Sequence, residues 1–260
     1  MGSNPILYSP NNMILHTTRN HTELELHKFN STIQQWTTTI QNGGNFTFIK
    51  FGDGEIICMM KKGTGTNCDG HPYHIELGTK LLEAWEYYAN TNQDTYIGEW
   101  ASSDNIRKFL DNLIEKHKPK FTFTDFEILL QNTITTEKYE LLKTIKHTDR
   151  NKIFVGPKRL SEVQKFLNID HMIEVPLLNS YSEYNNILEK CKELITPGTI
   201  ILYSAGMPTK VLVKDILTYN SEVTNIDFGS SFDAIFVGNT REGQPDPAML
   251  RVLYKDLIGF

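Results

Sequence analysis

The sequence predicts an α/β fold with a mostly parallel central sheet and helices on both faces of that sheet. Apolar runs of strand length alternate with amphipathic runs of helix length, and the alternation repeats in the second half of the chain. No linker rich in Pro or Ser and no repeat of fixed period interrupts the pattern. We therefore expect one domain that spans residues 1–260, a length that can bury a sizeable core.

The first half of the chain begins with a predicted helix at 22–42. Its apolar residues recur at mostly helical spacings, and Gly43-Gly44 follows as a stop signal. Further along we expect strands at 46–51, 95–100 and 120–124, helices at 75–90 and 104–117, one or two helices within 126–146, and a polar loop at 63–73.

The second half alternates more regularly. Strands are expected at 151–157, 171–178, 198–206 and 222–229, and helices at 159–168, 181–194 and 209–219. The runs FTFIKF and TIILYS are apolar enough to be covered on both faces, so we expect both to be interior strands.

Composition narrows the classes of function. Hydrophobic residues make up 39% of the chain and charged residues 22%, as in soluble globular proteins. The net charge is −5 and the basic residues are scattered, so we expect no nucleic-acid partner. No apolar run reaches the roughly 20 residues that cross a bilayer, and the N-terminus lacks a signal-peptide pattern, so we expect a cytoplasmic protein without a membrane span. Cys58, Cys68 and Cys191 form no close pair, which favours a reducing compartment and buried thiols.

The predicted strand ends are the candidate site segments, because ligands bind outside the carboxyl ends of parallel strands. Four segments stand out: KFGDGE at 50–55, GEW at 98–100, YSAGMPTK at 203–210 and IDFGSSFD at 226–233. Each contains a glycine, which permits unusual backbone angles or the close approach of a ligand. Strand-ending turns also need glycine for their own sake, so glycine alone does not decide the function.

Asp53 and Glu55 flank Gly54 directly after the first of these strands. The glycine lets the turn tighten, so both carboxylates can face one pocket. Hard oxygen ligands of this kind suit Mn²⁺ or Mg²⁺, which complete their shell with water and substrate phosphates. A solvated surface turn is the alternative. If the two acids hold an ion, replacing either with its amide should abolish metal-dependent ligand binding with little loss of thermal stability.

Three longer motifs resemble one known family. FGDGE after a strand, ILYSAGMPTKVLVKDIL and NIDFGSSFD are similar, in the same order, to the DxE segment, the late strand-turn-helix and the final strand end of the GT-D-type glycosyltransferases, a Rossmann-like group once described as a domain of unknown function. NKIFVGPKRLSEV resembles the middle of the family's second half, whereas 63–150 matches loosely. The chain has Lys50 where the family usually has Arg, and Ser230-Ser231 where a His is common.

The resemblance implies a Rossmann-like fold and the transfer of a hexosyl or pentosyl group from a nucleoside diphosphate sugar, in the first instance a UDP-sugar. The acceptor would be a hydroxyl of a glycan or glycoprotein. Asp53 and Glu55 would hold Mn²⁺ or Mg²⁺, which neutralises the leaving diphosphate. The other donor-binding residues that we expect from the motifs are Lys50, Gly52, Gly54, Ser204, Gly206, Thr209 and Lys210. For the turn at 203–210, an N-capped helix without a ligand is the alternative.

Four further residues are candidates outside the metal motif. His71 lies in a polar loop and can face the nucleotide or the metal, and Arg241 lies in a late loop and can reach a diphosphate with its guanidinium fork. Each can equally be a surface residue. An inverting enzyme needs a general base near the acceptor hydroxyl, and Asp233 and Glu99 are the candidates, with Asp233 favoured because it follows a family-like motif.

Two other classes of function remain open. One is a non-catalytic module that binds a nucleotide sugar or a glycan, and the other is a metal-dependent phosphohydrolase. The presence of both Asp53 and Glu55 argues against the first, and the lack of a further Asp/His ligand cluster argues against the second.

Overall fold

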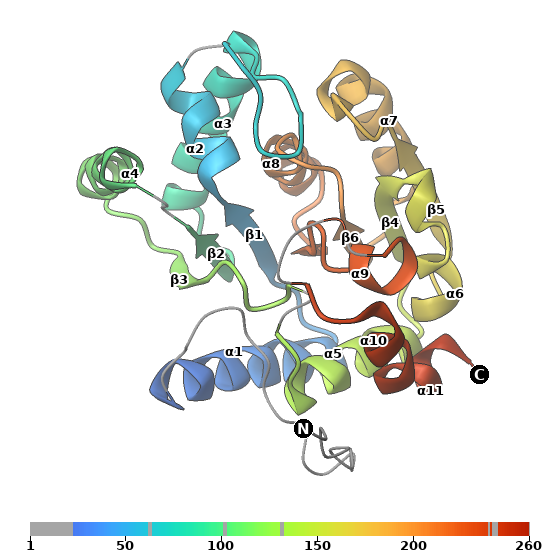
Figure 1. Cartoon of the computed structure of the whole chain (residues 1–260). Coiled ribbons are helices and arrows are strands. Elements are labelled where there is room, and N and C mark those ends of the chain that lie inside the picture. The colour runs from blue at the N-terminus through green and yellow to red at the C-terminus, as the bar shows by residue number, and fades with distance from the viewer. Residues whose placement is uncertain are drawn as a thin grey trace, which may run out of the picture.

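Seven parallel strands form one sheet in the computed structural model of the protein, and helices cover both of its faces (Figure 1). The structure describes residues 23–61, 64–100, 103–130, 133–238, 240 and 244–259. The strands are β1 (Thr47–Phe51), β2 (Thr95–Glu99), β3 (Thr122–Asp125), β4 (Lys152–Pro157), β5 (His171–Val175), β6 (Ile200–Tyr203) and β7 (Thr224–Asp227). Their order is β3-β2-β1-β7-β6-β4-β5. The predicted α/β fold with interior strands β1 and β6 is confirmed.

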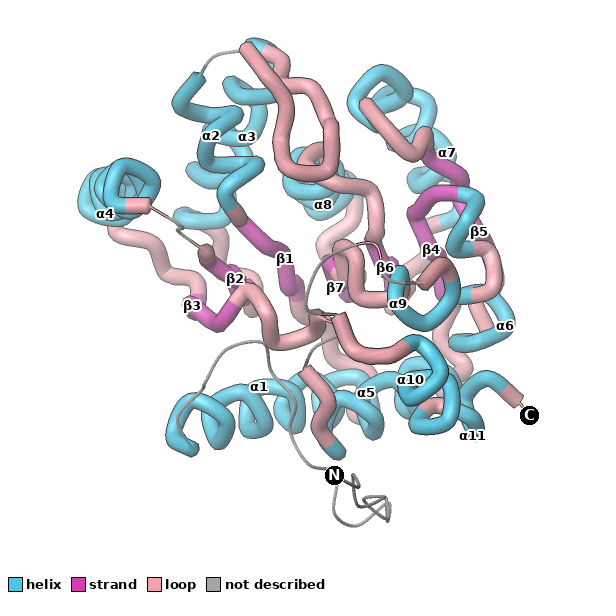
Figure 2. Tube along the Cα trace, in the orientation of Figure 1, coloured by secondary structure: helices cyan, strands magenta, loops and turns pink. Residues whose placement is uncertain are grey.

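The helices fall into two layers, as Figures 1 and 2 show. One layer holds α2 (Asp53–Lys61), α3 (Ile75–Asn90), α4 (Asp104–His117), α7 (Tyr184–Leu194) and α8 (Thr209–Tyr219). The other holds α1 (Glu23–Gln41), α5 (Thr136–His147), α6 (Val163–Leu167), α9 (Asp233–Phe236), α10 (Pro247–Leu253) and α11 (Lys255–Ile258). Two short 3-10 turns, η1 (Lys158–Leu160) and η2 (Ser180–Glu183), precede α6 and α7.

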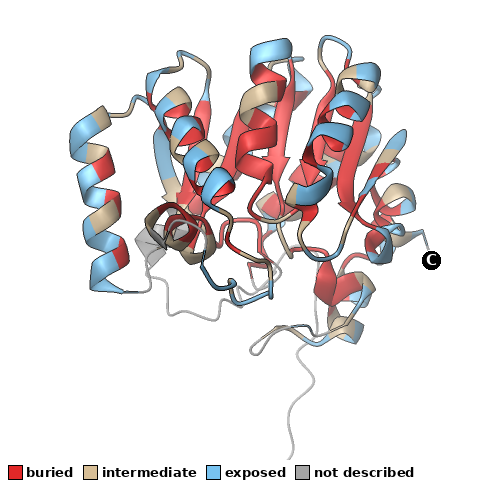
Figure 3. Ribbon diagram, turned by 90° about the horizontal axis from the view of Figure 1, so that it is seen from above, coloured by how far each residue is buried: buried red, intermediate tan, exposed pale blue. Residues whose placement is uncertain are grey.

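A hydrophobic core lies on each face of the sheet, because side chains alternate between the two faces along every strand. Successive side chains of a strand point to opposite faces, so neighbouring residues of β1 join different layers. Phe48 packs on Trp36 of α1, with ring centroids 4.8 Å apart, whereas Phe51 packs on Trp85 of α3 at 5.1 Å. Figure 3 shows the consequence, since the strands and the inner faces of the helices are buried and the outer faces are exposed.

The structure adds α9, α10 and α11 beyond residue 229, where no element was predicted, and it differs from the predicted elements at three earlier places. Asp53 begins helix α2, where the sequence indicated a turn. Among the described residues of 126–146, only α5 forms. Before it, Asp125 turns the chain by accepting a hydrogen bond from the Glu127 amide. Thr135 then caps α5 by accepting a hydrogen bond from Lys138 N. The segment 159–168 divides into η1 and α6.

Two further expectations concern cysteines and membranes. Cys58 and Cys191 are buried as predicted, but Cys68 is exposed, because it lies in a surface loop beside the candidate site. None of the helices in the described part of the chain is both long and apolar enough to span a bilayer.

Lys138 holds the connection between β3 and α5, which lines one side of the candidate site. Its buried ammonium donates to the carbonyls of Leu130 at 2.7 Å and Thr133 at 3.1 Å. Burial, with a smaller contribution from the charge of Lys50, lowers the pKa of Lys138 to about 7. Above that pH the unfolded chain binds a proton that the folded chain does not, so this residue makes the free energy of unfolding rise with pH.

We predict that this rise is lost when Lys138 is replaced by methionine. Between about pH 7 and pH 8.5, the difference in unfolding free energy between the wild type and Lys138→Met should grow by about 1.5 kcal/mol in favour of the wild type. Urea denaturation at several pH values measures it. Lys143→Met is the matched control on the same helix, because the Lys143 side chain is 51% exposed. A pH-independent difference for Lys138→Met would show that this lysine stays protonated in the folded protein.

Candidate functional site

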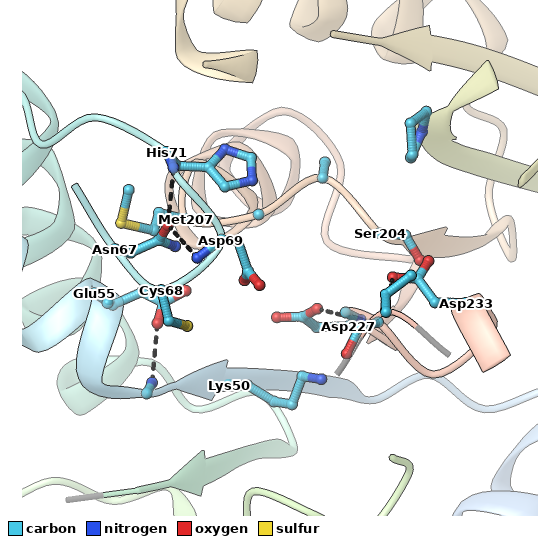
Figure 4. Close-up of a pocket in the computed structure, with 18 of the residues that line it drawn as sticks. Lys50, Glu55, Asn67, Cys68, Asp69, His71, Ser204, Met207, Asp227 and Asp233 are labelled. Atoms are coloured by element: carbon cyan, nitrogen blue, oxygen red, sulfur yellow. Dashed lines mark hydrogen bonds between the residues drawn. The ribbon is translucent and has the colours of Figure 1, made fainter. Parts of the chain in front are cut away.

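A pocket of about 600 Å³ opens at the carboxyl edge of the sheet, where the strand ends converge (Figure 4). The sequence-predicted residues that line it are Lys50, Gly52, Asp53, Gly54, Glu55, His71, Ser204, Gly206, Lys210 and Asp233. They come from segments far apart in the chain, and the all-parallel sheet brings them together because every strand ends at the same edge.

A buried ion triad lies at the inner end of this pocket. The ammonium of Lys210, on the first turn of α8, lies 2.7 Å from Glu55 Oε1 and 3.0 Å from Asp227 Oδ2. Burial opposes the charge of Lys210, but the interactions with Asp227 and Glu55 outweigh it and raise its pKa. The lysine therefore stays ionised and neutralises one of the two negative charges around it.

Glu55 also stabilises the start of helix α2. Its Oε2 accepts a hydrogen bond from the Gly52 amide at 3.0 Å, while the Gly52 carbonyl accepts from Ile56 N. This is half of a capping box, in which a side chain of the first turn satisfies the amide of the capping residue. Because both the cap and Lys210 hold Glu55, the structure gives a reason to expect its amide variant to lose stability, against the sequence-based expectation of little loss. Asp53, which has no such place in the triad, keeps that expectation.

The loop from Thr64 to His74 covers one side of the pocket. Asn67 organises it, since its Oδ1 accepts from the amides of Asp69 at 3.0 Å and His71 at 2.9 Å. In Figure 4 the Asp69 carboxylate points into the same space as that of Asp227. The loop thus adds an acid and an imidazole to the groups around the strand ends.

His71 lies against the turn before α8. Gly206 has a φ of +73°, and a Cβ there would come within 3.3 Å of the imidazole, so both its backbone angle and the close approach favour glycine. Burial lowers the pKa of His71, with Asp69 and Glu55 opposing this and Lys210 and Arg159 adding to it. The ring is therefore neutral at pH 7, and its Nδ1 is buried without a hydrogen-bond partner among the described residues.

Hydrogen bonds between loops fix the shape of the pocket mouth. His74 Nε2 lies 2.9 Å from Asn179 Oδ1, which joins the covering loop to the segment after β5. Ser180 Oγ donates to the Ala205 carbonyl at 2.6 Å, which joins that segment to the turn after β6. Three loops therefore hold one another in place around the opening.

Lys50 forms part of the floor. Its ammonium donates to the Phe228 carbonyl at 3.1 Å and lies 5.0 Å from the centre of the Phe126 ring. The residue is only 3% exposed, and Gly229, with a φ of +55°, leaves the space that the ammonium occupies. Lys50 thus supplies positive charge from beneath the pocket.

Asp233 begins α9 on the opposite side of the pocket from Glu55 (Figure 4). Its Oδ2 accepts from Arg159 Nη2 at 3.1 Å and from Thr240 Oγ1 at 3.3 Å. Ser204 lies nearby, and its buried hydroxyl has no hydrogen-bond partner among the described residues. This side of the pocket therefore offers a carboxylate, a guanidinium and a hydroxyl.

Two predicted site residues are not brought into the pocket, and a third is not among the described residues. Glu99 points to Arg107, whose Nη1 lies 3.1 Å from both carboxylate oxygens, and it does not line the pocket. Thr209 is fully buried beneath the turn and does not line it either. Arg241 lies outside the described residues.

Sequence reasoning missed four charged residues of the pocket: Asp69, Glu127, Arg159 and Asp227. Arg159 follows β4 by two residues, Glu127 follows β3 by two, and Asp227 ends β7, so the rule of strand ends would have found all three. Asp69 lies in a loop without such a signal. The pairing of Asp227 with Lys210 depends on the packing of α8 against the sheet, which no local pattern indicates.

Asp53 and Glu55 are the carboxylates at the start of α2 that would hold a hard divalent ion. No group of three or more His, Cys, Asp or Glu side chains forms a metal site within the described ranges. Mg²⁺ needs less, since one or two carboxylates with waters and phosphates complete its shell. Asp53 lines the pocket, and each oxygen of Glu55 uses one of its two lone pairs, on Lys210 or on Gly52 N.

The comparisons with known proteins concern the fold. No protein-family model and no curated protein matches the sequence. A selenomethionine-substituted structure of the domain of unknown function 1792 is 19% identical, with a TM-score of 0.53 over 85% of this chain and 88% of that chain. A structure of the same domain, described as having a distinct glycosyltransferase fold, is 17% identical, with a TM-score of 0.52 over the same shares. This chain therefore shares the fold of that domain, with a Rossmann-like parallel sheet.

The ion triad generates a prediction about stability. Replacing Lys210 with methionine leaves Glu55 and Asp227 buried without their counter-charge, which should lower the free energy of unfolding by about 3 to 5 kcal/mol. Urea denaturation at pH 7 measures this loss. Lys214→Met, one turn later on α8 and paired with Asp215 nearer the surface, should cost less than about 1 kcal/mol. Equal losses in the two variants would contradict the role of the triad.

Proposed function

We propose that this protein transfers a hexosyl or pentosyl group from a nucleoside diphosphate sugar, in the first instance a UDP-sugar, to a hydroxyl of a glycan or glycoprotein. The observation that carries the proposal is the pocket itself: in a glycosyltransferase fold, Asp53 and Glu55 face the same space as Lys50, Lys210 and Arg159. Acids that suit a divalent ion, next to cations that suit phosphate, are what a nucleoside diphosphate requires.

Mn²⁺ or Mg²⁺ is part of this proposal. Asp53 would hold the ion, with Glu55 contributing a lone pair that Lys210 and Gly52 leave unused. When bound, such an ion neutralises negative charge on a leaving diphosphate. The triad has a separate task, because Lys210 fixes the Glu55 carboxylate in one orientation whether or not an ion is present.

The remaining residues would bind and orient the donor. The Ser204 hydroxyl and the neutral His71 imidazole offer uncharged hydrogen-bonding groups to a sugar or a phosphate. Gly206 leaves the space that the His71 imidazole occupies, and the turn before α8 lines the pocket beside that ring. Arg241, from the late loop, is proposed as a further contact to the diphosphate.

Asp233 is the proposed general base if the reaction inverts the anomeric centre. Of the two acids that the sequence indicated, Asp233 lines the pocket and Glu99 does not. The contacts with Arg159 and Thr240 hold its carboxylate in place. A base must lie within hydrogen-bond reach of the acceptor hydroxyl, and a fixed carboxylate at a strand end meets that need.

The first test is metal-dependent binding and turnover. In calorimetry with UDP and Mn²⁺, Asp53→Asn should weaken affinity at least about tenfold, because it removes one charge and keeps the shape. Its unfolding free energy should change by less than about 1 kcal/mol, the range for a charge in the first turn of a helix. Asp104→Asn is the matched control, since Asp104 is also in a first turn, is exposed and lies outside the pocket.

Turnover with a panel of nucleotide sugars, with and without acceptors, separates the classes of function. Transfer to an acceptor supports the proposal. Phosphate release from the donor alone would indicate a phosphohydrolase, and binding without turnover across the panel would indicate a binding module. Unchanged UDP affinity in Asp53→Asn would remove Asp53 from the metal site.

The second test concerns the proton. Asp233→Asn should lose about a hundredfold to ten-thousandfold of the transfer rate, the usual contribution of a general base. It should still bind UDP and Mn²⁺, because the base acts on the acceptor. Single-turnover measurements with saturating donor isolate this step. Transfer at a near wild-type rate would mean that the reaction retains the anomeric configuration or that another residue, such as His71, takes the proton.

A further inference from the structure

Arg159 is the pocket cation that is most open to a ligand. It follows β4 on η1, and its side chain is 37% exposed, whereas Lys50 and Lys210 are each 3% exposed as residues. Within the described part of the chain it has one hydrogen-bond partner, Asp233 Oδ2, which uses a single nitrogen of the guanidinium. The other N–H groups of the guanidinium remain able to donate hydrogen bonds to a ligand.

The other two cations are already engaged by the protein. Lys210 is neutralised by Glu55 and Asp227, and Lys50 donates to the Phe228 carbonyl beneath the pocket. Neither can turn its ammonium to a ligand without giving up a buried contact. Arg159 can bind a ligand without losing a buried contact, because Asp233 engages only the Nη2 nitrogen of its guanidinium.

Arg159 and the acids lie around the same space. Asp69, Glu55 and Lys210 line the pocket together with Arg159, and the His71 ring lies over Gly206. Glu55 and Asp69 come from α2 and the covering loop, while Arg159 and its partner Asp233 come from η1 and α9. A ligand with negative charge and a bound cation can therefore meet acids through its cation and Arg159 through its own oxygens.

We infer that Arg159 binds the diphosphate of the donor, with Asp233 as the residue that positions its guanidinium. This inference rests on the proposed function and names a contact that the sequence did not indicate. A guanidinium presents paired N–H donors that match two phosphate oxygens, which a lysine cannot do. The two partners do not compete, since they meet different edges of the planar group.

Calorimetry with UDP, UMP and uridine, each with Mn²⁺, tests the inference. Arg159→Gln should weaken UDP binding about tenfold to a hundredfold, as expected for lost hydrogen bonds to a charged group. UMP should lose less and uridine nothing, because the contact is to phosphate. Arg159→Lys should restore part of the affinity. Lys158→Gln, the exposed neighbour on η1, is the matched control and should bind UDP like the wild type.

Asp233→Asn separates binding from a structural role of Arg159. The Asn amide oxygen can still accept a hydrogen bond from Arg159 and so keeps the guanidinium in place, while the pocket loses one negative charge, so affinity for UDP and for inorganic pyrophosphate should stay the same or rise. If Asp233→Asn loses as much affinity as Arg159→Gln, or if Arg159→Gln binds UDP like the wild type, the inference is wrong while the proposed function stands. If the wild type binds no nucleoside diphosphate at all, both fail.

Discussion

The site depends on one interaction, the ammonium of Lys210 between the carboxylates of Glu55 and Asp227. It joins α8, α2 and β7 at the middle of the sheet's carboxyl edge. Buried charges are costly unless each has a partner, so all three side chains must stay where they are. The position of Glu55 also fixes the start of α2, because the same carboxylate accepts a hydrogen bond from the Gly52 amide and so caps the helix that begins at Asp53.

The sheet topology makes this interaction possible. Strand β7 is last in the chain but pairs with β1, the first strand, so Asp227 and Glu55 come together despite their separation in sequence. The same arrangement puts acids on the side of α2 and the covering loop, and Arg159 beyond β6 on the β4 side. Acids and cations therefore face one pocket from both sides, with the pair of Arg159 and Asp233 across from Glu55 and Lys210, which suits a ligand that carries phosphates and a divalent ion.

Much of this fold could be predicted from local patterns. The helices α3, α4 and α8 have their predicted bounds because their apolar spacing and stop signals are unambiguous. Helix α2 was not predicted because the sequence of its first turn resembles that of a loop turn. Glu55, a residue of that first turn, caps the helix by accepting a hydrogen bond from the Gly52 amide. Strand ends identified nine lining residues, but the pairing of Lys210 with Asp227, the contact of Arg159 with Asp233 and the ion pair of Glu99 with Arg107 depend on packing that the strand ends do not indicate.

The most direct test is a crystal structure of the protein with Mn²⁺ and UDP. The anomalous signal of manganese locates the ion without assumptions about the ligand. We expect manganese within coordination distance of the Asp53 carboxylate, the diphosphate between it and Arg159, and Glu55 still paired with Lys210. Manganese bound away from Asp53, a diphosphate outside the pocket, or a Glu55 side chain that leaves Lys210 to reach the ion would contradict this account.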